Sequence, residues 1–300
     1  MVESARKICK RFHSYIRLQP YRGKVLSVFS KAVNIQTEFG IVSLLTNTDC
    51  LHPFSCIVGA IRPFNQMNIH TDDEVLIENE AIKFPKADLA IDVSLALDME
   101  LSLDVMVNLF IPIDLNIRLR QLQRVIESFA EADDMSPMVL NTKSNPYCDL
   151  VRPRLERLNE RLKEGTVEEC CQAAASISGC GIGLTPSSDD LLSGFFAAYA
   201  ALSQALGRNR AKVIDLTRRM AFAAAQHTTD LSGAFLLQSG EGLVSEDVFQ
   251  LLRCIFSDIS YPTLVAYATQ VATYGSTSGT DTLTGIYLAI TQHYGGTDID

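Results

Sequence analysis

The sequence predicts an α+β protein in which a β-rich, barrel- or sandwich-like domain is followed by an all-α helical domain. Short runs of β-favouring residues separated by turns fill the first third of the chain, whereas apolar residues recur every three or four positions after residue 114. The length of 300 residues and a hydrophobic content of 47% allow each domain a buried core. We place the two domains at residues 1–135 and 136–300.

The N-terminal domain is expected to open with a helix and to continue as strands. Basic residues lie among apolar ones in residues 1–20, which predicts a short amphipathic helix. Runs rich in Val, Ile, Leu and Phe predict strands at 24–29, 32–35, 41–45, 55–61, 74–78 and 81–84, and further strand within 89–111. The loops hold His52, Asn65, His70, Asp72 and Asp73, and we favour polar loop surface over a metal site there.

An apolar repeat from Leu115 to Phe129 indicates a helix that flanks the strands of the N-terminal domain. The Ser-, Asn- and Pro-rich stretch 136–150 indicates a linker or, alternatively, a functional loop, and the C-terminal domain after it is predicted to be helical throughout. Thr166 and Glu169 have the spacing of a capping box. Helices are expected at 152–162, 166–179, 189–206, 210–226, 230–240, 244–257, 261–273 and 281–293, with a frayed tail at 295–300.

A glycine-rich stretch at 179–190 reads Gly-Cys-Gly-Ile-Gly-Leu-Thr-Pro-Ser-Ser-Asp-Asp and runs directly into an apolar helix. Glycine permits a positive φ, Pro186 fixes its own φ, and Ser187 or Ser188 is the expected N-cap. The stretch matches neither the Walker A loop nor the dinucleotide fingerprint. It predicts a tight loop whose helix N-terminus holds a small anion; a plain capped turn is the alternative.

A second loop, 275–285, repeats the first in outline. When Asp281 is aligned with Asp190, Ser278 aligns with Ser187 and Gly285 aligns with Gly194. Both copies share the pattern Ser-x-x-Asp-x-Leu-Ser/Thr-Gly and lead into an apolar helix. We therefore expect the two loops to face one ligand.

Composition excludes several classes of function. The formal net charge of -9 argues against a general nucleic-acid or acidic-membrane surface. No apolar run approaches a membrane span and the charged N-terminus lacks a signal peptide, so a cytoplasmic protein is expected. None of the eight cysteines forms a C-x-x-C pair or a zinc-like spacing. Cys180 lies inside the glycine loop without a paired base, and His227 lies at a polar break where a structural cap is favoured over acid–base chemistry.

These motifs resemble the AllH-like family, members of which are linked to ureide catabolism as one subunit of oxamate carbamoyltransferase. The family signature Gly-x-Gly-x-Gly-Leu-Thr-Pro-Ser-Gly-Asp-Asp is similar to residues 179–190, with Ser188 where the family has Gly. The second loop and the strand pair within 23–45 also look similar to the family. The resemblance implies the reaction of oxalurate and phosphate to oxamate and carbamoyl phosphate, or its reverse, with other subunits needed for activity.

The resemblance also implies roles for individual residues. Asp190 and Asp281, with His227, would be catalytic; the aspartates would accept from the carbamoyl NH₂, orient serines or bind Mg²⁺, and otherwise no cofactor or metal is expected. A small anionic substrate would be bound by Gly181, Gly183, Thr185, Ser187, Ser188, Asp189, Ser278 and Gly279. A non-catalytic anion-binding or scaffold subunit and a metal-dependent hydrolase built on the aspartates are the alternatives.

Overall fold

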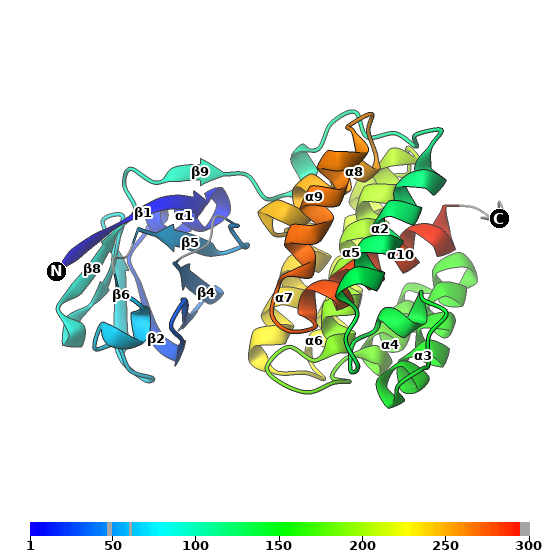
Figure 1. Cartoon of the computed structure of the whole chain (residues 1–300). Coiled ribbons are helices and arrows are strands. Elements are labelled where there is room, and N and C mark those ends of the chain that lie inside the picture. The colour runs from blue at the N-terminus through cyan, green and yellow to red at the C-terminus, as the bar shows by residue number, and fades with distance from the viewer. Residues whose placement is uncertain (47–49, 60–61, 295–300) are drawn as a thin grey trace. The chain divides into compact units, whose positions relative to one another are not determined.

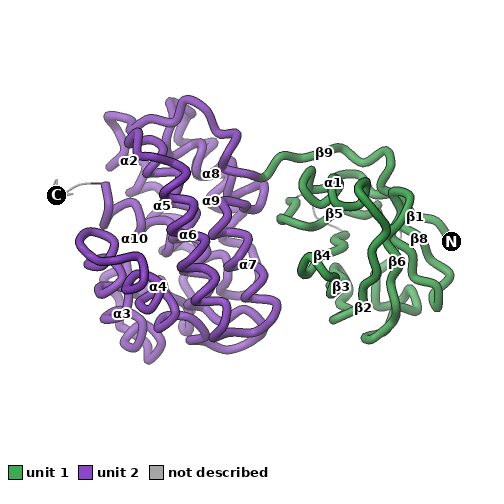
Figure 2. The backbone as a smooth tube through the Cα atoms, turned by 180° about the vertical axis from the view of Figure 1, so that it is seen from behind, with its two compact units in different colours: residues 1–101 green, residues 102–300 purple. Residues whose placement is uncertain are grey.

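The computed structural model describes residues 1–46, 50–59 and 62–294, which form two compact units (Figure 2). Unit 1 comprises residues 1–101 and unit 2 residues 102–300. The division therefore lies after Leu101, whereas the sequence suggested residue 135. The stretch 136–150 is no linker between units, because it lies within unit 2 and contains buried residues and the start of a helix.

Unit 1 is a β-barrel, as predicted (Figure 1). Eight strands follow one another around it in the order β5-β4-β3-β2-β6-β7-β8-β1, and an antiparallel pairing of β1 with β5 closes the ring. A short ninth strand pairs with the far end of β1. The bounds are β1 Val2–Cys9, β2 Tyr21–Val28, β3 Ala32–Thr37, β4 Gly40–Leu45, β5 Ser55–Val58, β6 Glu74–Glu78, β7 Ala81–Phe84, β8 Leu89–Asp92 and β9 Leu97–Met99.

The predicted helix over residues 1–20 is wrong in its first half, because β1 occupies Val2–Cys9 and only α1 (Lys10–Leu18) is helical. The strand hydrogen-bonds to β5, β8 and β9, so pairing with distant segments overrides the local pattern. The other predicted strands are found, although the strand at 55–61 ends at Val58, and residues 60–61 lie outside the described part. Within 89–111 only β8 and β9 are strands.

Unit 2 is helical, as predicted, and its helices follow the expected ranges except α3, which begins at Pro146 rather than at residue 152. Their bounds are α2 Leu115–Phe129, α3 Pro146–Glu164, α4 Val167–Ile177, α5 Ser187–Ala205, α6 Arg210–Ala225, α7 Asp230–Gly240, α8 Glu246–Ile255, α9 Tyr261–Ala272 and α10 Ser278–His293. The capping box of Thr166 and Glu169 at α4 is present. The frayed tail predicted at 295–300 lies outside the described residues.

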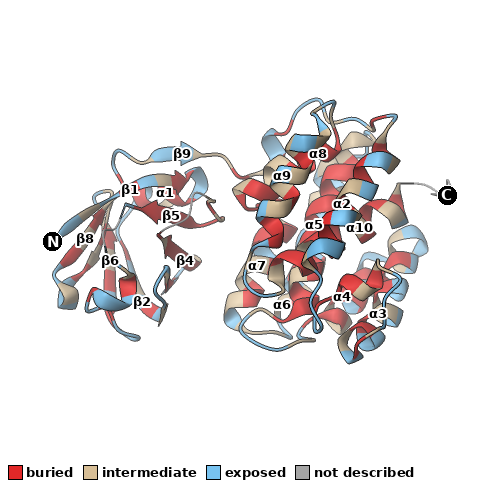
Figure 3. Ribbon diagram, viewed as in Figure 1, coloured by how far each residue is buried: buried red, intermediate tan, exposed pale blue. Residues whose placement is uncertain are grey.

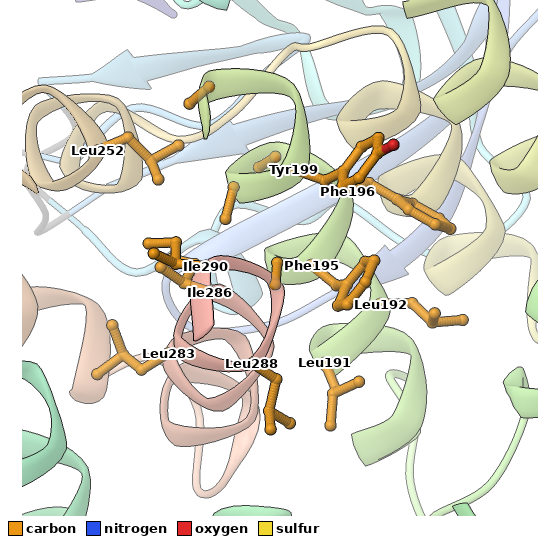
Figure 4. Close-up of a cluster of buried hydrophobic side chains, with 14 of the residues drawn as sticks. Leu191, Leu192, Phe195, Phe196, Tyr199, Leu252, Leu283, Ile286, Leu288 and Ile290 are labelled. Atoms are coloured by element: carbon orange, nitrogen blue, oxygen red, sulfur yellow. The ribbon is translucent and has the colours of Figure 1, made fainter. Parts of the chain in front are cut away.

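The core of unit 2 is built around α5, most of whose residues are buried (Figure 3). Apolar side chains from α5 pack with those of α10 in one cluster, which includes Phe195, Leu283 and Ile286 (Figure 4). Both helices therefore lie in the interior, and the loops that start them are held by the core. In the described residues no helix combines the length and the apolar character that crossing a bilayer requires.

Candidate functional site

Helices α5 and α10 pack with reciprocal contacts between equivalent residues of the two sequence repeats. A Cβ on Gly194 would lie 2.1 Å from the carbonyl oxygen of Thr282, and a Cβ on Gly285 would lie 1.9 Å from that of Leu191. Thr282 and Leu191 are also equivalent in the two repeats. The glycine of each helix therefore contacts the equivalent backbone carbonyl group of the other helix. The helices are thus related by a local pseudo-two-fold, and only glycine permits this close approach.

The loops ahead of these helices meet, as the sequence comparison suggested. The hydroxyl oxygens of Thr185 and Ser278 are 3.1 Å apart. Ser278 also faces the carboxylate of Asp190 and opposes the rise in its pKa, whereas Ser187 does the same for Asp281. Each aspartate is therefore accompanied by the serine of the opposite loop.

The two aspartates occupy environments that disfavour their charge. Asp281 is fully buried, and its Oδ1 accepts a hydrogen bond of 2.6 Å from the backbone N–H of Met135. Burial raises the pKa of Asp281 to about 7, although this hydrogen bond acts in the opposite direction. Asp190 is partly exposed as a residue, but its carboxylate is buried, and this burial raises its pKa well above the ordinary value. The Oδ2 atoms of Asp190 and Asp281 are buried and have no hydrogen-bond partner among the described residues.

Asp189 differs from both, because protein donors surround its carboxylate. Its Oδ1 accepts from the Ser178 hydroxyl and the Gly179 N–H, each at 2.8 Å. Its Oδ2 accepts from the hydroxyls of Thr228 and Ser232. Asp189 therefore ties the glycine loop to the turn that precedes α7.

Positive φ angles at Gly179, Gly181 and Gly183 shape the glycine loop, as predicted. A Cβ on Gly181 would lie 2.4 Å from the backbone nitrogen of Ser187, so the loop folds tightly onto the start of α5. The backbone N–H groups of residues 181–185 donate to no acceptor in the described protein. Consecutive free N–H groups with glycines at positive φ are the arrangement that proteins use as an anion-binding nest.

The expected side-chain cap of α5 by Ser187 or Ser188 is wrong, because Pro186 is the N-cap residue and no side chain caps this end. The Ser188 hydroxyl instead accepts from the Cys180 N–H at 2.8 Å, and the Ser188 N–H donates to the Cys180 carbonyl at 3.0 Å. Ser188 thus closes the glycine loop. The N–H groups of residues 188–190 already donate within the protein, whereas those of residues 181–185 remain free in the described part of the chain.

His227 lies against the glycine loop, and Cys180 is part of it. The backbone carbonyl of His227 lies against Gly179, where a Cβ would be 2.4 Å from it, while the His227 side chain is exposed. The Cys180 thiol accepts from the Arg154 guanidinium at 3.5 Å. Among the described residues no group of three or more His, Cys, Asp or Glu side chains is spaced to hold a metal ion, which includes the loop residues of unit 1.

Sequence reasoning missed the groups that complete the site from outside the two motifs. A main-chain N–H such as that of Met135 has no sequence signature. The buried Asp134 next to it accepts from Ser136 and from the backbone of Glu131, which fixes the segment that reaches Asp281. The sequence pointed to His227 as a candidate residue but gave no role to Thr229, whose hydroxyl donates to the Leu184 carbonyl in the structure.

Comparison with known protein families covers both units. One family model, described as oxamate carbamoyltransferase subunit AllH, matches residues 177–290, which include both loops. A second, the AllH family N-terminal domain, matches residues 4–98, which correspond to the barrel. No curated protein and no solved structure gives a significant match. Since the two models together cover most of the chain, the protein belongs to the AllH family.

Proposed function

We propose that this chain is a subunit of a carbamoyltransferase that acts on oxalurate and phosphate, or in reverse on oxamate and carbamoyl phosphate. The family description, a subunit of oxamate carbamoyltransferase, supports the reaction class and the need for partner subunits. The observation that carries the assignment to a site is the meeting of the two loops, with Thr185 and Ser278 3.1 Å apart. The substrate is bound where the loops face each other.

The proposed reaction is a displacement at the carbamoyl carbon. A phosphate oxygen forms a bond to that carbon, the bond from carbon to the oxamate nitrogen breaks, and this nitrogen takes up a proton. Negative charge develops on the carbamoyl oxygen, so donors held at fixed positions lower the barrier. The free N–H groups of residues 181–185 and the hydroxyls of Thr185, Ser187 and Ser278 are suited to hold the anionic groups.

Each remaining predicted site residue receives a role in this proposal. Asp190 and Asp281 lie beside the reacting group. Asp189 and Ser188 hold the loop in shape, since their side chains are engaged by protein donors. Gly279 follows Ser278 at the start of α10. The exposed ring of His227 serves as an acid–base group, a role that His227→Gln would test through the pH profile of kcat.

The function is tested by assaying carbamoyl phosphate formation from oxalurate and phosphate. The chain is purified alone and together with the subunits that co-purify with it from its native cell. Activity in the complex that falls at least about a hundredfold in Ser278→Ala supports the proposal. A Ser257→Ala variant, changed at a partly exposed serine in the turn after α8, is the matched control. Full activity of a complex that lacks this chain would contradict a catalytic role.

A scaffold or anion-sensing subunit is the second candidate, and the free N–H groups of residues 181–185 favour it equally, because they bind an anion without reaction. The two candidates differ in the aspartates. In a scaffold, Asp190→Asn and Asp281→Asn leave turnover by the complex unchanged, whereas in a catalytic subunit they abolish it. No observation favours the metal-dependent hydrolase, since Asp189 accepts four hydrogen bonds from the protein.

A further inference from the structure

Among the described residues of unit 2, two buried carboxylate oxygens have no hydrogen-bond donor, and they come from equivalent residues of the two repeats. They are Oδ2 of Asp190 and Oδ2 of Asp281. Buried polar atoms in folded proteins are almost always hydrogen-bonded, and those that are not point to a missing ligand, water or ion. The remaining buried carboxylates nearby follow the rule, since Asp189 and Asp134 accept from several donors each.

The fold holds Asp281 directly and places a hydroxyl beside each carboxylate. Asp281 is fully buried, and its other oxygen is held by the Met135 N–H. Ser278 lies beside Asp190 and Ser187 beside Asp281, so each carboxylate has a hydroxyl of the opposite loop next to it. The glycine contacts of α5 with α10 set the spacing of the two helix starts. The two acceptors therefore belong to equivalent residues of two helices that are related by the local pseudo-two-fold.

We propose that the Oδ2 atoms of Asp190 and Asp281 together hold the NH₂ group of the carbamoyl group, one N–H on each oxygen, and so select carbamoyl over acyl substrates. The inference rests on the proposed function. An amide NH₂ has two N–H bonds that diverge symmetrically about the C–N bond, which matches two acceptors related by a pseudo-two-fold. The anionic end of the same substrate is left to the loop N–H groups.

The charge state of the pair agrees with this assignment. Burial raises the pKa of both carboxyl groups, so near neutral pH the pair carries less than two negative charges. The remaining negative charge strengthens a hydrogen bond from an N–H group without strongly repelling the nearby phosphate or carboxylate of the substrate. The remaining negative charge would repel an anion placed directly on the pair, so the pair does not itself form the anion site.

A binding comparison with the full-length chain tests the proposal. Phosphonoacetamide and 2-oxopropylphosphonate have the same phosphonate and differ only in NH₂ against CH₃. A site that leaves two buried acceptors unpaired rejects the methyl analogue. Titration calorimetry in EDTA is expected to give at least about tenfold tighter binding for the amide.

The outcomes separate this inference from the proposed function. Equal binding of amide and methyl analogues would mean that water satisfies the two oxygens, which overturns the inference and leaves the anion site standing. Amide binding that disappears in EDTA and returns with Mg²⁺ would place a cation on the pair and would also overturn it. Discrimination without turnover by the complex would support the inference and contradict the transferase. Failure of both compounds to bind would contradict both.

Variants provide a second readout. Asp281→Asn replaces an acceptor by a donor, so it should weaken amide binding at least about tenfold while binding of the methyl analogue changes little. Asp215→Asn, at an exposed aspartate paired with Arg218, is the matched control and should leave both affinities unchanged. Equal losses for both analogues in Asp281→Asn would point to a disturbed loop and would contradict the role in selection.

Discussion

Three aspartates of unit 2 show how the surroundings of one residue type set what it does. Asp189 accepts from four donors and binds segments of the chain together. Asp281 is equally buried but accepts one backbone hydrogen bond, and burial raises its pKa to about 7. Asp190 is its counterpart on the other loop, with its pKa also raised by burial. The first is suited to structure and the other two to binding or proton transfer.

The raised pKa of Asp281 makes stability depend on pH in a defined direction. Between about pH 4 and pH 7 the folded state holds a proton that the unfolded state has released, so this group's stabilising contribution is complete below pH 4 and is lost as pH rises through 7. A shift from 3.8 to about 7 corresponds to about 4 kcal/mol.

Asp281→Asn resembles the neutral, protonated form of Asp281 and therefore removes this group's contribution to the pH dependence of stability. Relative to the native chain, the variant should gain free energy of unfolding from pH 4 to pH 7 and level off above pH 7. Urea unfolding at pH 4.5 and pH 8 measures the difference, with Asp215→Asn as the control. A difference that is the same at both pH values would contradict an up-shifted carboxyl at this position.

Asp189→Ala should destabilise unit 2 by several kcal/mol. The substitution leaves buried donors without an acceptor, among them the Ser178 and Ser232 hydroxyls, and each such donor costs about 1–3 kcal/mol. Urea unfolding followed by far-ultraviolet circular dichroism measures the loss. Asp215→Ala, which removes an exposed carboxylate, should change stability by less than about 1 kcal/mol. If Asp189→Ala lowered the free energy of unfolding no more than Asp215→Ala does, the loops would not depend on the Asp189 carboxylate.

At the scale of elements, the close contact of α5 with α10 determines where the two loops lie. At Gly194 and at Gly285, a backbone carbonyl group of the other helix occupies the space that a Cβ atom would need. The helices approach so closely only because both positions lack a side chain. The same approach brings Ser278 to Thr185, so helix packing and site geometry have one cause.

Gly285→Ala should therefore separate the helices, cost at least about 3 kcal/mol and abolish ligand binding, since a Cβ 1.9 Å from a carbonyl oxygen forces backbone movement. Gly207→Ala isolates backbone strain without a clash, because its φ is +67° and nothing lies within 4 Å of its Cβ. That control should cost about 1–2 kcal/mol and leave binding intact. Thermal unfolding with and without phosphonoacetamide measures both effects, and equal losses in the two variants would contradict the packing argument.

The sequence allowed prediction of those elements that are determined by local chemistry. The glycine loop, the capping box at Thr166 and the equivalence of Asp190 with Asp281 follow from residue spacing alone. Strand β1 does not, because its partners β5 and β8 come from much later in the chain. The contribution of Met135 was equally hidden, since a backbone N–H has no residue-type signal.

At the scale of the whole molecule, the chain divides after Leu101 into units that each have their own core. All residues of the candidate site belong to unit 2, and the family models likewise match the two units separately. A fragment of residues 102–300 should consequently fold and bind phosphonoacetamide with the affinity of the full chain. Circular dichroism and titration calorimetry of the fragment measure this, and a folded fragment without binding would show that unit 1 contributes to the site.

The account depends on one ligand being held by both loops at once. A crystal structure of the chain with phosphonoacetamide tests this most directly. We predict that the ligand nitrogen lies within hydrogen-bond distance of Oδ2 of both Asp190 and Asp281, with the phosphonate on the backbone N–H groups of residues 181–185. A ligand bound elsewhere, or bound by one loop alone, would contradict the account.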